Sequence, residues 1–164
     1  MDDEVQRIYP LYIAGGKGWK DSEIYQAYEQ SDFKDQIHFL NYVSDEQLAA
    51  LYQSCYAMVY PSFYEGFGMP ILEAMAAGAP VTSSDTTSMP EVGGDAVLYV
   101  QPEDIRSIAK AMEKLQIDQG LRDDLAQRGR KRALSVFGWD RCAEITLRTM
   151  YDAVKYRAEV EGLE

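Results

Sequence analysis

Residues 60–81 read YPSFYEGFGMPILEAMAAGAPV, and this stretch decides the fold that the sequence predicts. An apolar run at 56–60 predicts a buried strand, and a loop with two glycines follows it. Pro70 is expected to open a helix and Gly78 to end it, because proline suits the first helical position and glycine the position just past the last. The stretch therefore predicts a strand–loop–helix unit, from which parallel α/β folds are built.

The loop of this unit suits an anion. The main-chain N–H groups of Gly66, Phe67, Gly68 and Met69 precede or begin the predicted helix, so they lack acceptors within it. Together with the positive end of the helix dipole, these groups favour phosphate above other anions. Glycine also lets the main chain approach a ligand closely. The sequence therefore predicts a phosphate-binding loop at the head of this helix.

Two carboxylates flank the loop, with seven residues between them. Glu65 lies in the loop, and Glu73 is expected within the first turn of the helix. Carboxylates repel phosphate, so they are better matched to neutral donors such as the hydroxyls of a sugar or a ribose. Hydrogen bonds to charged groups contribute roughly 1.5–3 kcal/mol each, which is enough to orient a ligand. Open α/β sheets bind ligands at the carboxyl ends of their strands, so this pattern predicts a nucleotide-sugar site.

The motif Glu65-x7-Glu73, within EGFGMPILEAMAAGAPV, resembles the signature of the retaining glycosyltransferases of family 4, also called group 1. These are GT-B enzymes with two Rossmann-like halves. Three further segments resemble the flanks of that motif in the same order: IHFLNYVSDEQLAALYQSCYAMVYPS, SSDTTSMPEVGGDAVLYVQPED and FGWDRCAEITLRTMYDAV. The resemblance covers residues 8–156, and it implies the carboxyl-terminal, donor-binding half of such an enzyme.

The resemblance implies transfer of a hexose, with retention, from a nucleotide-diphosphate sugar such as GDP-mannose or UDP-glucose to a glycan or lipid-linked acceptor. It implies that Glu65 is catalytic, binding the hydroxyls of the donor sugar and stabilising an oxocarbenium-like transition state, and that Glu73 binds the ribose. The positions implied for donor-sugar and phosphate binding are Gly16, Lys17, Gly66, Phe67, Gly68, Met69 and Pro70, and those for the nucleobase are Asn41, Tyr42 and Val43. Members of the family are metal-independent, so no cofactor and no metal are expected.

Several alternatives stay open. Lys17 also fits a solvated loop lysine, and residues 41–43 also fit a plain strand-to-helix turn. A sugar-nucleotide-binding module without activity of its own is the main rival function. An epimerase or phosphorylase would share the fold, but the motif favours glycosyl transfer. A phosphoacceptor receiver domain would need an aspartate where Pro61 stands, and an NAD-binding glycine fingerprint is broken at Asp21.

The resembled family begins its donor half with a strand that this chain is expected to lack, together with an Arg and a Lys that hold the diphosphate. Because phosphoryl leaving groups depend on such charges, the chain alone is expected to turn over very little. In the strand order 3-2-1-4-5-6 the absent strand is a central one. Its neighbours should then pair with another segment or another chain, for example in a homo-oligomer. The acceptor is expected to bind through an N-terminal domain.

The remaining sequence predicts a Rossmann-like parallel sheet with helices on both faces, in one domain over 1–164 with its core at 8–156. The predicted strands lie near 8–14, 37–40, 56–60, 80–83 and 96–100. Between them, Ser44 and Gln47 form a predicted capping box, Pro102 is expected to start a helix, and Asp118 to cap the next one. A final long helix from Trp139 is expected to pack its apolar face in the core, in part against a domain outside this chain.

Composition limits the partners and the cellular location that are expected for this chain. The chain has 164 residues and a formal net charge of −11, which argues against nucleic acid as a partner. The basic run at 128–132 is expected to be a solvated helix face, with an anionic-lipid patch as the alternative. Cys55 and Cys142 are expected in the core rather than in a bridge. With neither a membrane span nor a signal peptide in view, the expected location is the cytoplasm, with peripheral attachment to the inner membrane left open.

Overall fold

The computed structural model describes residues 9–16, 18 and 21–161. These residues form two compact units that divide between Leu48 and Ala49, within helix α2 (Asp45–Ser54). Every sheet is parallel, and the predicted α/β class with Rossmann-like strand–helix alternation is confirmed. The prediction of one domain over 1–164 stays a prediction.

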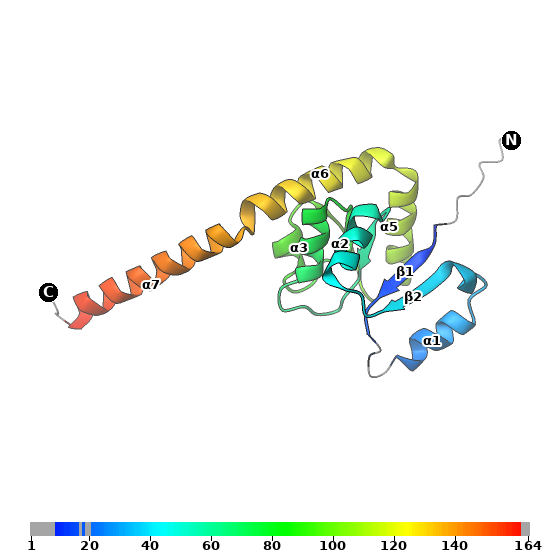
Figure 1. Ribbon diagram of the computed structural model, residues 1–164, viewed down its shortest axis with the longest axis horizontal. Helices are drawn as coiled ribbons and strands as arrows, with labels where there is room; N and C mark the ends of the chain where they lie inside the picture. The colour runs from blue at the N-terminus through cyan, green and yellow to red at the C-terminus, as the bar shows by residue number, and fades with distance from the viewer. Residues whose placement is uncertain (1–8, 17, 19–20, 162–164) are drawn as a thin grey trace. The chain divides into compact units, whose positions relative to one another are not determined.

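The first unit is a two-stranded sheet with a helix between its strands. Strand β1 (Leu11–Ala14) pairs in parallel with β2 (Ile37–Asn41), and helix α1 (Ser22–Glu29) and the 3-10 turn η1 (Lys34–Gln36) connect them (Figure 1). Tyr25 and Tyr28 of α1 pack against Phe39 of β2, with ring centroids 5.1 and 5.3 Å apart. The predicted capping box at the start of α2 is confirmed, because Ser44 N donates to Gln47 Oε1 (2.9 Å) and Gln47 N to Ser44 Oγ (3.3 Å).

The second unit contains a three-stranded sheet in the order β3-β4-β5. Its strands are β3 (Met58–Tyr60), β4 (Val81–Ser84) and β5 (Val97–Val100). Its remaining helices are α3 (Met69–Ala77), α4 (Met89–Gly93), α5 (Ile105–Ile117), α6 (Gln119–Val136) and α7 (Trp139–Glu161). If strand 1 is removed from the order 3-2-1-4-5-6, two groups of neighbouring strands remain, 3-2 and 4-5-6. The two sheets of this chain, β1-β2 and β3-β4-β5, correspond to these two groups. The absence of that strand and a compensating oligomer stay predictions.

The core of the second unit lies between α3, the sheet and α6. Ile71 and Met75 of α3 are fully buried, together with Val81 of β4 and Met89 of α4. Helix α6 can approach α3 closely because Gly129 faces Met75, where a Cβ atom at Gly129 would lie 3.0 Å from Met75 Cγ. This packing fixes the direction of α3, and therefore the position of its first turn.

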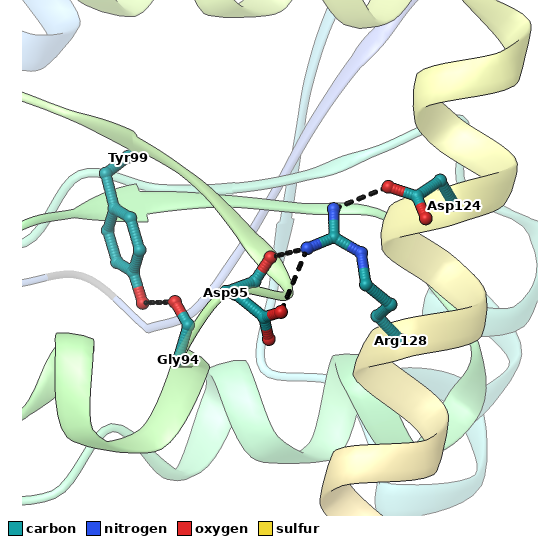
Figure 2. Close-up of polar contacts among 5 residues, drawn as sticks. All are labelled: Gly94, Asp95, Tyr99, Asp124 and Arg128. Atoms are coloured by element: carbon teal, nitrogen blue, oxygen red, sulfur yellow. Dashed lines mark hydrogen bonds and ion pairs between the residues drawn. The ribbon is translucent and has the colours of Figure 1, made fainter.

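The basic run at 128–132 is a solvated face only in part: Arg130 and Lys131 are exposed, whereas Arg128 and Arg132 brace α6 against α4 and the turn after it. Arg128 donates to Asp124 (2.5 Å) and to the carbonyl of Asp95, and Tyr99 donates to the carbonyl of Gly94 (2.8 Å) (Figure 2). Arg132 donates from Nε to the Val92 carbonyl at 2.8 Å. Arginine forks satisfy carbonyl groups that the short helix α4 and the turn after it leave without partners.

Of the two predicted helix starts after the sheet, one is wrong and one is confirmed. Helix α5 begins at Ile105 rather than at Pro102, because the side chain of Asp104 accepts a hydrogen bond from Arg106 N (2.9 Å) and so caps it. Asp118 caps α6 as predicted, accepting from Leu121 N at 2.8 Å.

The apolar face of α7 is exposed rather than packed in the core. Its large exposed side chains include Trp139, Leu147, Met150, Tyr151 and Val154. Cys142 on the same helix is exposed, and Cys55 is half-buried just after α2.

Candidate functional site

Two loops meet at the carboxyl edge of the sheet in the second unit. One loop joins β3 to α3 and carries the predicted motif, and the other joins the neighbouring strand β4 to α4. Three hydrogen bonds connect them: Thr86 Oγ1 donates to the Phe63 carbonyl (3.2 Å), Glu65 N to Thr87 Oγ1 (3.3 Å) and Ser88 Oγ to the Glu65 carbonyl (2.9 Å). The second loop therefore holds the main chain of Glu65 on both sides.

Hydrogen bonds fix the side-chain carboxylate of Glu65 in addition to its main chain. Its Oε1 atom accepts hydrogen bonds from Tyr60 Oη at 2.5 Å and from Ser62 Oγ at 2.9 Å. Tyr60 is the last residue of β3 and is half-buried. Burial raises the pKa of Tyr60, and the hydrogen bond to Glu65 raises it further. Tyr60 is therefore a neutral donor over the whole physiological pH range.

The start of helix α3 leaves main-chain N–H groups without acceptors among the residues that the structure describes. Gly68 is its N-cap residue and adopts a left-handed conformation (φ 97°), and Met69 rather than Pro70 is its first residue. The N–H groups of Ile71 and Leu72 donate to the Gly68 carbonyl at 3.0 and 3.3 Å. Within the described part of the chain, nothing accepts from the N–H groups of residues 66–69. Four main-chain donors are therefore available at the positive end of α3.

Glu73 lies just past the first turn of α3, where the sequence predicts it within that turn. It is the fifth residue of the helix, past the first turn, because the helix begins at Met69 and the Gly68 cap precedes it. Its side chain is exposed and lies beside Tyr52 of α2. Burial, and then the charge of Glu73, raises the pKa of Tyr52 to about 12. Tyr52 also acts electrostatically on Tyr60. Tyr52 therefore responds to the charge of Glu73, and Tyr60 to that of Glu65.

The raised pKa of Tyr52 can be tested through the pH dependence of stability. Its pKa in the folded protein lies above the ordinary value of 10.0, so folding favours the neutral phenol. The resulting contribution to the free energy of unfolding is complete below about pH 10 and declines as the pH rises through about 12. Denaturant titrations across this range should show a weaker decline for Tyr52→Phe than for the wild type. The control Tyr42→Phe, at a side chain that is 84% exposed, should keep the wild-type decline. An equal decline in all three proteins would contradict the assignment.

The first unit has a pocket of about 310 Å³ at the carboxyl ends of β1 and β2. Two predicted site residues, Gly16 and Asn41, line it, and Gly15 N donates to the Asn41 carbonyl at 2.9 Å. Asn41 has a φ of 55°, which asparagine tolerates better than most residues. The pocket also contains Asp21, Tyr25 and Phe39, which the sequence analysis did not assign to a site. Of the other predicted positions, Tyr42 is exposed, Val43 is half-buried, neither lines the pocket, and Lys17 lies outside the described residues.

The second unit has an apolar pocket of about 350 Å³ that the sequence did not predict. The side chains of Phe67 and Met69 line it together with Leu72 and residues of the α6–α7 junction, and Phe67 packs edge-on against Phe137 at 5.9 Å. Phe67 and Met69 therefore offer only their main-chain groups to a ligand at the head of α3. Among the described residues, no group of three or more His, Cys, Asp or Glu side chains could hold a metal ion, and no helix is long and apolar enough to span a membrane.

Comparison with known proteins gives consistent similarities. The sequence model of the family "Glycosyl transferases group 1" matches residues 4–132. The O-antigen chain mannosyltransferase B of Escherichia coli is 43% identical over 145 residues, which are 88% of this chain and 38% of that protein. Sucrose-phosphate synthase from Thermosynechococcus elongatus matches with a TM-score of 0.78 at 26% identity, covering 90% of this chain and 39% of that one. The C-terminal domain of a glycosyl transferase group 1 family protein from Francisella tularensis matches with a TM-score of 0.64 at 27% identity, covering 74% and 66%.

Proposed function

The chain belongs to the group 1 glycosyl transferases, and on this premise we propose that it is the carboxyl-terminal, donor-binding half of a retaining hexosyltransferase. It spans 38% of the length of the mannosyltransferase that it matches, so the proposal for this chain is binding of the donor. The donor is a nucleotide-diphosphate hexose such as GDP-mannose or UDP-glucose. The acceptor, a glycan or a lipid-linked sugar, is proposed to bind elsewhere in the whole protein.

One observation carries the proposal: the unpaired main-chain donors of residues 66–69 lie next to a carboxylate that is held in place. The donors and the dipole of α3 favour a pyrophosphate, whose charge they neutralise in part. The Glu65 carboxylate repels phosphate and favours hydroxyl donors. A ligand with an anionic part and a carbohydrate part satisfies both requirements, and a nucleotide-diphosphate sugar has both.

The proposed chemistry follows from these charges. As the bond between the anomeric carbon and the leaving phosphate oxygen lengthens, positive charge develops on the sugar and negative charge on the diphosphate. The Glu65 carboxylate stabilises the former, and the N–H groups at the head of α3 stabilise the latter. The acceptor hydroxyl then attacks the same face of the sugar that the diphosphate leaves and gives its proton to the departing phosphate oxygen, which retains the configuration. No metal is required by this scheme.

Roles for the remaining residues rest on the resemblance. Glu73 is proposed to bind the two ribose hydroxyls, and its exposure leaves its carboxylate accessible to them. Asn41 lines a pocket in the first unit, which supports its proposed part in nucleobase binding, and Gly16, which lines the same pocket, keeps its proposed part in donor-sugar and phosphate binding. Nucleobase binding by Tyr42 and Val43, and phosphate binding by Lys17, stay predictions.

Calorimetry tests the proposal on this chain. We expect saturable one-to-one binding of at least one donor from a set of GDP and UDP hexoses, and weaker binding of GMP or UMP, which lack the second phosphate. The same solutions are expected to show very little sugar transfer to a glycan acceptor. Absence of binding by every nucleotide and nucleotide sugar would overturn the proposal, and efficient transfer by this chain alone would overturn its restriction to donor binding.

A further inference from the structure

The carboxylate of Glu65 has one oxygen that is occupied and one that is not. Tyr60 Oη and Ser62 Oγ both donate to Oε1, at 2.5 and 2.9 Å. Among the described residues, no donor binds Oε2. A carboxylate oxygen that already accepts two hydroxyl hydrogen bonds has little remaining capacity, so Oε2 is the oxygen available to a ligand.

The two hydroxyl donors are themselves fixed by the fold. Tyr60 ends β3, where it pairs in register with Ser83 of β4, and Ser83 Oγ donates to its carbonyl at 3.1 Å. Ser62 follows two residues later, and its hydroxyl also lies 3.3 Å from the carbonyl of Tyr64, within the same loop. Strand β4 therefore fixes the main chain of Tyr60, and the loop itself fixes the hydroxyl of Ser62. The main chain of Glu65 is bound from Thr87 and Ser88 as well, so the carboxylate has few ways to move.

We infer that Tyr60 and Ser62 are positioning residues: they bind Oε1 of Glu65 and so present Oε2 to the hydroxyls of the donor sugar. The inference rests on the proposed function of Glu65. It assigns a role in sugar binding to two side chains that need not touch the sugar. Preorganisation of this kind lowers the entropy lost when the ligand binds, because the carboxylate is already in its bound orientation.

The test compares two ligands on the full chain. Calorimetry gives the dissociation constants of a nucleoside diphosphate and of the corresponding nucleotide sugar, and their ratio reports the sugar alone. For Tyr60→Phe and for Ser62→Ala we expect the dissociation constant of the nucleotide sugar to rise about 3- to 10-fold relative to that of the nucleoside diphosphate. The dissociation constant of the nucleoside diphosphate itself should change little. Tyr99→Phe is the matched control, because it also removes one hydrogen bond of a half-buried strand tyrosine, to the Gly94 carbonyl, and should leave the ratio unchanged.

A double-mutant cycle separates positioning from a general effect on folding. In a Glu65→Ala background, Tyr60→Phe and Ser62→Ala should no longer change the ratio, because the carboxylate that they position is gone. Ser62→Ala serves as the second test if Tyr60→Phe lowers stability. An unchanged ratio in both single variants, or an equal change with and without Glu65, would overturn the inference while leaving the proposed function intact. Failure of the wild type to bind either ligand would overturn both.

Discussion

Replacing Ile71 with alanine is expected to lower the free energy of unfolding of the second unit by about 2–5 kcal/mol. Ile71 is fully buried in the core cluster, on the face of α3 that packs toward the sheet and α4. Truncation removes three methyl or methylene groups and leaves a cavity that the neighbouring side chains fill only in part. Chemical denaturation measures the change.

The matched control for this prediction is Ile105→Ala. Ile105 begins α5 and is 79% exposed, so the same truncation creates no cavity and should change the free energy of unfolding by well under about 1 kcal/mol. Similar losses for the two variants would mean that α3 is not the packed centre of the unit. The position of its first turn, and with it the candidate site, would then lose its structural basis.

Replacing Glu73 with alanine is expected to weaken the binding of a nucleoside diphosphate by roughly 10- to 100-fold. The proposed role of Glu73 is to accept hydrogen bonds from ribose hydroxyls, and each bond to a charged group contributes roughly 1.5–3 kcal/mol. Because the exposed carboxylate gives up bound water when it accepts these hydrogen bonds, we expect the net gain to be about that of one such bond, which corresponds to roughly 10- to 100-fold in the dissociation constant.

A second ligand makes the Glu73 prediction specific. The wild type should prefer the ribonucleotide over its 2′-deoxy analogue, and Glu73→Ala should bind the two almost equally. Glu91→Ala, at an exposed glutamate of helix α4, should keep both the affinity and the preference. Retention of the ribose preference by Glu73→Ala would remove Glu73 from the site.

The elements of the fold could be predicted because their signals are local. Gly78 and Asp118 mark helix ends through backbone conformation and capping, which depend on a few neighbouring residues. The start of α5 was misplaced for the same kind of reason: Pro102 suits a helix start, but Asp104 provides the side-chain cap and the helix begins after it. The exposed face of α7 could not be predicted, because an apolar stripe does not reveal whether its partner belongs to the same chain.

The sequence predicts the motif of the candidate site but not the hydrogen bonds that hold it in place. Glu65, Glu73 and the loop amides follow from spacing and from the helix start. The hydrogen bonds from Thr87 and Ser88 to Glu65 cross more than twenty residues, and they depend on β3 and β4 being neighbours in the sheet. The run of serine and threonine residues after the predicted strand at 80–83 is the sequence signal from which these hydrogen bonds could have been expected. The pattern predicts Tyr60 as a strand residue, which it is, but nothing local predicts that its hydroxyl reaches Glu65.

The central claim is that the amides at the head of α3 bind a pyrophosphate, and amide NMR of the chain during titration with a nucleoside diphosphate tests it most directly. The account predicts that the resonances of Gly66, Phe67, Gly68 and Met69 shift saturably with one dissociation constant. The resonance of Gly78, at the opposite end of the same helix, should stay in place. Saturable binding that moves other amides and leaves those four unchanged would contradict the account.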